Sequence, residues 1–285
     1  MIASLILLAG GAAAGLFGSL LGLGGGILIV PMLTLGFGVP LREAVAVSLV
    51  SVIVTSSASA GVYLQRHVAN LRLGMVLELF TASGALVGGL VAFLIDERVL
   101  AGLFALLMVW VMVSMVRRSD PAPARAEAAA PPVASGPSSA PAQAPAAAPD
   151  DSFTARLSGP GYRVGRFPTG IAGSLFAGVV SALLGVGGGI VKVPVMHLVM
   201  GVPLKVATAT SNMMIGITAT SSAVIYLLRG GIDPYLAGPT AFGVFLGASL
   251  GSRVAGRIDV KLLRWLFIVV LAYTAVSMAR KALAL

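Results

Sequence analysis

Long runs of apolar residues separated by short polar breaks dominate this chain. A bilayer core of about 30 Å is crossed by about 20 helical residues. Most of the runs approach that length and predict spanning helices. They cover 2–21, 27–37, 41–64, 73–95 and 99–116 in the first half, and 169–184, 190–200, 204–228, 235–255 and 262–282 in the second.

Two runs are too short to span a bilayer. Residues 27–37 and 190–200 would each extend only about 17 Å at a rise of about 1.5 Å per residue. Both directly follow a run of glycines. Short helices at membrane depth are tolerated where they are buried in protein or line a cavity. We therefore expect each to be one arm of a broken, re-entrant helical hairpin.

The middle of the chain has a different composition. Residues 117–167 are rich in proline, alanine and serine, with almost no large apolar side chains in their central part. Such a segment buries too little surface to offset the entropy of ordering it. We expect a disordered cytoplasmic linker at 117–167, joining an N-terminal membrane repeat (1–116) to a C-terminal one (168–285).

Composition strengthens the membrane interpretation. Hydrophobic residues make up 58% of the chain and charged residues 10%, with a mean hydropathy of +1.00. Soluble domains carry about 25% charged residues. The net charge of +9 comes from residues between apolar runs, where they set topology and face anionic lipid. We therefore expect a lipid partner and no nucleic acid. With no cysteine, disulfides and thiolate metal sites are excluded, and we expect no metal or cofactor.

The two halves repeat each other. The segment Gly22-Leu-Gly-Gly-Gly-Ile-Leu-Ile-Val-Pro31 aligns without a gap on Gly185-Val-Gly-Gly-Gly-Ile-Val-Lys-Val-Pro194, and a Gly-Val-Pro-Leu element follows each, at 38–41 and 201–204. Repeated halves with glycine-interrupted apolar segments are typical of secondary transporters, whose site lies at the repeat interface.

Loop charges indicate the orientation of the halves. A basic loop, 66–72, follows the run 41–64, whereas the basic loop of the second half, 253–264, comes one helix later. Basic loops remain cytoplasmic, so this alternation predicts inverted repeats. We expect an all-α polytopic fold in which each repeat has three spanning helices and one broken hairpin. The basic C-terminal end, Arg280 and Lys281, fits this topology less well.

The paired G-x-G-G-G-I-x-x-V-P elements, each followed by Gly-Val-Pro and a Ser/Thr-rich helix, resemble the TauE/SafE family of sulfite exporters and organosulfonate permeases. The resemblance covers nearly the whole chain except the linker. It implies a transporter of sulfite, a sulfonate or a related small anion, and does not specify which anion or which direction.

The glycine runs are the first candidate for a binding site. Exposed backbone N–H groups in such turns can bind anions, and the helices that follow add their positive dipole ends. This interpretation selects Gly24, Gly25 and Gly26, with Gly187, Gly188 and Gly189. The alternative is that these glycines only permit close helix packing. A dinucleotide-binding loop is rejected, because no βαβ unit surrounds the motif.

Lys192 is the second candidate. It lies inside an apolar arm, where its counterpart in the first half is Ile29. A cation at membrane depth is costly and is by default a functional-site hypothesis, and its ammonium could neutralise a bound anion. Alternatively, the side chain extends to the membrane interface.

Hydroxyl and titratable residues complete the candidate set. The runs 41–64 and 204–228 carry Ser and Thr at helical spacing; Ser48, Ser211 and Asn212 lie nearest the Gly-Val-Pro bends and are the preferred substrate contacts. Such a stripe also suits ordinary helix packing. Glu78 could couple proton movement, or could simply reach the basic loop 66–72. His197 could relay protons or be satisfied locally.

A secondary transporter that binds a small sulfur-containing anion between inverted repeats is the leading hypothesis. A passive anion channel is the main alternative, because paired half-helices also build pores. An enzyme is disfavoured by the absence of H-E-x-x-H, G-x-S-x-G and paired intramembrane acids. A scaffold would leave Lys192 and the glycine breaks unexplained. The sequence leaves open whether the protein forms a homo-oligomer.

Overall fold

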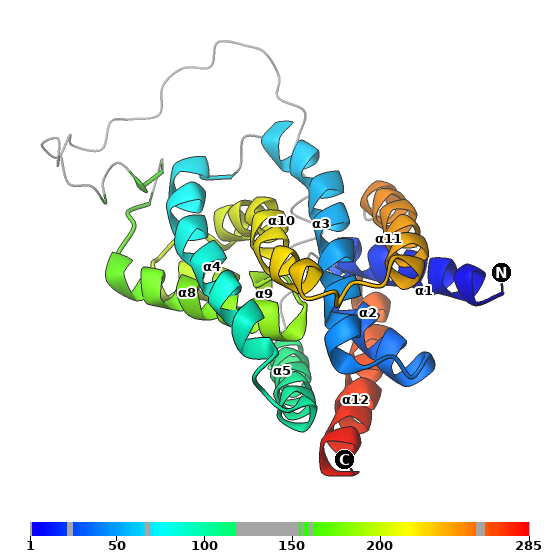
Figure 1. Cartoon of the computed structure of the whole chain (residues 1–285). Helices are drawn as coiled ribbons and strands as arrows, with labels where there is room; N and C mark the ends of the chain where they lie inside the picture. The colour runs from blue at the N-terminus through cyan, green and yellow to red at the C-terminus, as the bar shows by residue number, and fades with distance from the viewer. Residues whose placement is uncertain are drawn as a thin grey trace, which may run out of the picture.

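A computed structural model describes residues 2–21, 25–65, 69–117, 154, 157–159, 162–254 and 260–284, and these are helical almost throughout (Figure 1). The first half contains α1 (Ile2–Leu21), α2 (Gly26–Pro31), the π-helical turn η1 (Met32–Gly36), α3 (Leu41–Gln65), α4 (Leu71–Ala92) and α5 (Glu97–Arg117). The second contains α8 (Phe167–Leu184), α9 (Gly189–Pro194), the π-helical turn η2 (Val195–Val199), α10 (Leu204–Leu228), α11 (Pro234–Val254) and α12 (Val260–Ala284). Within the described ranges the only β-type contact is one bridge between Gly159 and Tyr162. The all-helical prediction is confirmed.

Among the described residues, five helices are long and apolar enough to cross a membrane. Their qualifying stretches are Leu41–Ala58, Leu71–Ala92, Glu97–Ser114, Phe167–Leu184 and Val206–Leu228. Large apolar side chains also face outward on these helices; Leu79 and Leu106 are each 67% exposed. Such surface is unfavourable in water and favourable against lipid. The chain is therefore a multi-pass membrane protein.

The two short arms have the interrupted form that their length predicts. Each begins one residue earlier than expected, at Gly26 and Gly189, and each changes to a π-helical turn directly after a proline, Pro31 or Pro194. Proline lacks the N–H that an α-helical hydrogen bond requires, so a local change of helix type follows. Each arm then ends at a glycine with positive φ, 65° at Gly38 and 73° at Gly201, where the backbone turns toward the next helix.

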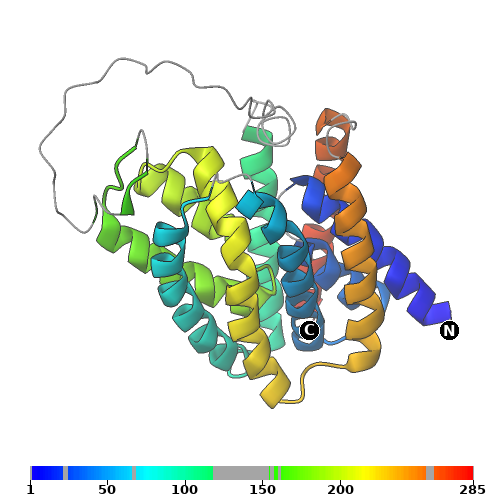
Figure 2. The same ribbon diagram turned by 90° about the horizontal axis from the view of Figure 1, so that it is seen from above.

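The helix contacts between the two halves come in equivalent pairs, in which each helix is replaced by its counterpart from the other half. Helix α1 packs against α11, and its counterpart α8 packs against α4. The central helices α3 and α10 pack against each other, as do α5 and α12. Figures 1 and 2 show α4 with α8 on one side of the molecule, α1 with α11 on the other, and α3 and α10 between them. The sequence duplication is therefore also a duplication of the packing.

Glycines at equivalent positions make some of the closest of these approaches. A Cβ at Gly84 of α4 would collide with the carbonyl oxygen of Leu175 in α8, and one at Gly247 of α11 would collide with that of Ala12 in α1. Gly84 and Ala12 lie 163 positions before Gly247 and Leu175. Small residues let membrane helices approach to backbone contact. Here they allow the same close approach in the α4–α8 pair and in the α11–α1 pair.

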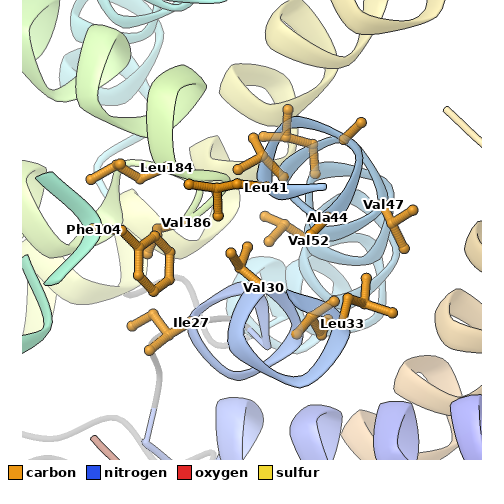
Figure 3. Close-up of a cluster of buried hydrophobic side chains, with 14 of the residues drawn as sticks. Ile27, Val30, Leu33, Leu41, Ala44, Val47, Val52, Phe104, Leu184 and Val186 are labelled. Atoms are coloured by element: carbon orange, nitrogen blue, oxygen red, sulfur yellow. The ribbon is translucent and has the colours of Figure 1, made fainter. Parts of the chain in front are cut away.

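The central core surrounds α3. Leu41, Ala44, Val47 and Val52 of this helix are each at most 1% exposed. Figure 3 shows them beside Ile27, Val30 and Leu33 of the α2–η1 arm, with Phe104 of α5 and with Leu184 and Val186 at the end of α8. One face of the first arm is therefore buried in protein, and burial in protein is the condition under which a short helix is tolerated at membrane depth.

The segment predicted as a linker lies outside the described residues from 118 to 153. Its far end is packed: Leu157 and Val164 are buried, in a cluster with Met196 and Met200 of the second arm. The last part of 117–167 therefore differs from the expected tether, because two apolar side chains there find a surface of the second repeat to cover them.

Candidate functional site

A buried ion pair joins α4 to the second arm. The Nζ atom of Lys192 in α9 lies 2.5 Å from Oε2 of Glu78 in α4, and the side chains are 2% and 5% exposed. The hydroxyl of Thr218 in α10 donates to the other carboxylate oxygen, Oε1, at 2.6 Å. Buried charges require both a counter-charge and hydrogen bonds, and this arrangement supplies them from three helices.

This geometry excludes one alternative for each of the two charged residues, and their functional roles stay predictions. Lys192 does not extend to the membrane interface, and Glu78 does not reach the loop at 66–72, because each is engaged by the other. Sequence reasoning selected the two residues separately and missed their pairing. The available signal was the rule that opposite charges inside a membrane pair with one another. Thr218 lies on the predicted hydroxyl stripe, but nothing in the sequence distinguishes it there.

The ion pair has no counterpart at the positions that the repeat makes equivalent to it. The positions that correspond to Glu78, Lys192 and Thr218 are Ala241, Ile29 and Thr55. Ile29 is fully buried, and the hydroxyl of Thr55 donates to the carbonyl oxygen of Ser51 on its own helix. The duplicated scaffold thus carries one charged centre, formed by Glu78 of the first half with Lys192 and Thr218 of the second.

The two glycine breaks meet each other, and the second precedes the arm that carries Lys192. The hydroxyl of Ser48 in α3 is shared between the carbonyl oxygen of Gly26 at 3.1 Å and that of Gly185 at 2.7 Å. A Cβ at Gly26 would lie 2.5 Å from the Gly185 carbonyl oxygen, and one at Gly187 would lie 2.8 Å from Val52 Cγ1. Close packing is therefore one role of these glycines, and Ser48 bridges the halves.

The backbones of the two breaks differ. Gly187 and Gly188 have φ of 81° and 74°, in the left-handed region that favours glycine. Gly25, in contrast, has φ of −63° in the right-handed helical region. Gly24 lies outside the described residues. A positive-φ turn is thus present at the second break, and Gly25 of the first break does not share it.

Two unpaired hydroxyls adjoin the second break. Ser181 of α8 and Ser211 of α10 are fully buried, and neither Oγ has a hydrogen-bond partner among the described residues. Ser181 Oγ lies 3.6 Å from where a Cβ of Gly188 would be, and Ser211 Oγ lies 3.5 Å from that of Gly189. Buried hydroxyls are normally satisfied, so these two are available to a ligand. Ser211 was among the predicted contacts; Ser181, on a helix with no hydroxyl stripe, was missed.

Asn212 and His197 have other surroundings. Asn212 is buried, and its backbone carbonyl accepts a hydrogen bond from Ser56 of α3 at 3.0 Å. His197 Nδ1 lies 2.9 Å from the carbonyl oxygen of Val202, five residues later. The local interpretation of His197 therefore matches the geometry, and no contact links it to Glu78 among the described interactions.

The described residues hold no group of three or more metal-ligating side chains. A cavity of about 610 Å³ does open between α1, the first arm and α12, but its lining is almost entirely apolar, including Phe17, Met32, Phe37 and Phe267. None of the candidate site residues lines it. The Lys192–Glu78 centre is closed in this conformation.

A multi-pass helical bundle with a duplicated fold, short helices held inside it and a closed charged centre belongs to the class of membrane transport proteins. The comparison with known families gives the particular group: residues 7–278 match the family described as sulfite exporter TauE/SafE, and the chain belongs to that family. The family consists of membrane transporters, not enzymes.

Curated relatives agree with this assignment. The probable membrane transporter protein YunE of Bacillus subtilis is 27% identical over 263 residues, covering 90% of each chain. The probable membrane transporter protein MamO of Magnetospirillum gryphiswaldense is 26% identical over 93% of this chain and 43% of its own length. The sulfite exporter TauE/SafE family protein 5 of Arabidopsis thaliana is 37% identical over 86 residues, 30% of this chain and 18% of its own. No solved structure matches the chain.

Proposed function

We propose that this protein is a secondary transporter that moves a small sulfur-containing anion, sulfite or an organosulfonate, across the cell membrane by alternating access. The observation that carries the proposal is Lys192, a buried cation in the arm that begins at the second glycine break. A cation at that depth is retained where it meets a charged ligand or relay.

The donors beside the second glycine break, at the start of the arm that carries Lys192, suit an SO₃ group. Its three oxygens accept hydrogen bonds, and the unpaired hydroxyls of Ser181 and Ser211 border the Gly188–Gly189 turn, one helical turn before Lys192. We assign the binding site to these residues, with Gly187 at the positive-φ turn. The broader set inferred from the sequence stays part of this proposal: Gly24, Gly25, Gly26, Gly187, Gly188, Gly189, Lys192, Ser48, Ser211 and Asn212.

Alternating access is supported by the duplicated packing and by the closed site. Inverted repeats can present one site to either side by exchanging their conformations. The α1–α11 and α4–α8 contacts join equivalent helices of the two halves. The loop charges favour opposite orientations of the halves. Lys192 is 1% exposed, which fits an occluded state better than an open anion pore.

The test is anion counterflow in proteoliposomes, comparing sulfite, methanesulfonate, sulfate and acetate. We expect saturable exchange of the two SO₃-bearing anions and little exchange of acetate. Because Lys192→Gln would strand the Glu78 carboxylate, the matched variant is the neutral pair Lys192→Gln/Glu78→Gln, which should fold and lose exchange. Equal exchange of all four anions, or currents far above transporter turnover, would favour the channel alternative.

A further inference from the structure

The structure raises a question of charge balance at Lys192. Its ammonium is already neutralised by the Glu78 carboxylate at 2.5 Å. An arriving anion would place two negative charges beside one positive charge in a region almost without water. Burying an uncompensated charge is strongly unfavourable, so anion binding requires that one of the two negative charges be removed.

No other described group supplies the compensation. Helix α8, which packs against α4, has no titratable side chain, and α10 offers only Tyr226, whose hydroxyl donates to the Ala182 carbonyl at 3.0 Å. The side chain of Lys205, in the first turn of α10, lies outside the described residues. On α4 itself Arg72 lies six residues before Glu78, and His197 of η2 faces the Val202 carbonyl.

We propose that Glu78 is the proton-binding group of the transporter, and that a proton binds Glu78 whenever an anion binds Lys192. This inference rests on the proposed function. A proton adds to Oε2, the ion pair with Lys192 breaks, and an anion oxygen takes the place of Oε2 beside Nζ. The centre carries the same net charge before and after a monovalent anion enters. One proton therefore travels with each monovalent anion in the same direction, and its release restores the ion pair.

Thr218 has a positioning role in this exchange. Its hydroxyl donates to Oε1 at 2.6 Å, so it stabilises the carboxylate and holds Oε2 toward Lys192. Without that hydrogen bond the charged form of Glu78 is less favoured. A Thr218→Val protein should then take up the proton at higher pH, while the shape of the side chain is conserved.

The experiment measures methanesulfonate binding to the full-length protein in nanodiscs over a series of pH values. Methanesulfonate remains a monovalent anion throughout, so any pH dependence belongs to the protein. When one proton binds with each anion, the apparent Kd for methanesulfonate rises about tenfold per pH unit. This slope applies over the pH range in which Glu78 is ionised before the anion binds. In proteoliposomes with a clamped membrane potential, a methanesulfonate gradient should drive protons in the same direction.

Variants assign the effect to Glu78. We expect Glu78→Gln to bind methanesulfonate with no pH dependence and to move it without protons, because an amide takes up no proton in this range. Glu97→Gln, the same change in the first turn of α5, should keep the tenfold dependence. Should Glu78→Gln not fold, Thr218→Val serves instead: its pH dependence should shift to higher pH, and an unshifted profile would count against the proposal.

The outcomes separate the two proposals. Wild-type binding that does not vary with pH, or pH dependence that persists in Glu78→Gln, overturns the proton-coupling inference and leaves the transporter intact. An absence of methanesulfonate and sulfite binding by the wild type overturns the proposed function and the coupling with it.

Discussion

The hydroxyl of Ser48 in α3 donates to the carbonyl oxygen of Gly185, which lies 137 residues later at the end of α8, over 2.7 Å. The same hydroxyl is also within 3.1 Å of the Gly26 carbonyl oxygen, at the start of the first arm. One side chain therefore connects the two glycine breaks, and through them the two halves of the molecule. A buried link of this kind has consequences for stability that can be measured.

Ser48→Ala should lower the stability of the protein by about 1–3 kcal/mol, because both carbonyl oxygens lose a buried donor. Thermal unfolding of the purified protein in detergent measures the change. Ser57→Ala is the matched control: it lies on the same helix, is exposed, and donates only to the Ile53 carbonyl of its own helix. Equal melting temperatures for the two variants would show that the Ser48 bridge contributes nothing.

The Lys192–Glu78 pair predicts a non-additive result. Lys192→Gln alone leaves a buried carboxylate without its cation, which costs about 3–5 kcal/mol. The double variant Lys192→Gln/Glu78→Gln removes both charges and should recover most of that loss. The measurement is a double-mutant cycle of unfolding in detergent.

Anion binding adds a second observable to this cycle. In Glu78→Gln the ammonium of Lys192 lacks its carboxylate, so methanesulfonate should raise the melting temperature of that variant more than it raises that of the wild type. Additive effects of the two single substitutions would show that the residues do not interact in the folded protein.

The sequence predicted the helical class and the broken arms because each depends on local properties. Run length and glycine position act within a few residues. The duplication was also visible, since it is a comparison of the chain with itself. The packing of α1 against α11 and of α4 against α8 could not be predicted from the sequence, because all the apolar helix faces have a similar hydropathy.

The sequence pointed to several residues of the candidate site, but not to the contacts between them. Lys192 and Glu78 were identified because single charges in apolar runs are rare, but their contact depends on a crossing of α4 and the second arm that no spacing encodes. Ser181 was missed because two serines on α8, Ser174 and Ser181, are too few to stand out among its small residues. Only its lack of a partner in the folded protein marks it.

The glycine contacts predict equal effects at equivalent positions of the two halves. Gly84→Ala and Gly247→Ala should each destabilise the protein by about 1–3 kcal/mol, because the added methyl group meets a backbone carbonyl of the neighbouring helix. Gly238→Ala, on the same helix as Gly247, meets nothing within 4 Å and should be neutral or stabilising through its helix propensity. Thermal unfolding compares the three. A neutral Gly247→Ala beside a costly Gly84→Ala would contradict the duplicated packing.

The packed end of the linker depends on Asn70, the residue before α4. Its side-chain oxygen accepts from the Leu73 amide at 3.0 Å and so caps the helix, while its Nδ2 donates to the Leu157 carbonyl at 2.8 Å and to the Tyr162 hydroxyl at 2.7 Å. Capping and docking therefore use different atoms of one side chain, and substitutions can separate them.

Asn70→Asp keeps the capping oxygen and removes the two donors, so hydrogen exchange should accelerate at Val164 and Gly165, whose amides bond to Ser158 Oγ and the Met200 carbonyl, and not at Leu73. Asn70→Ala should accelerate exchange at all three sites and cost about 1–2 kcal/mol more through the lost cap. Tyr162→Phe should reproduce part of the aspartate effect, since it removes one acceptor. Unchanged exchange at Val164 in Asn70→Asp would mean that apolar burial of Leu157 and Val164 alone holds this end of the linker in place.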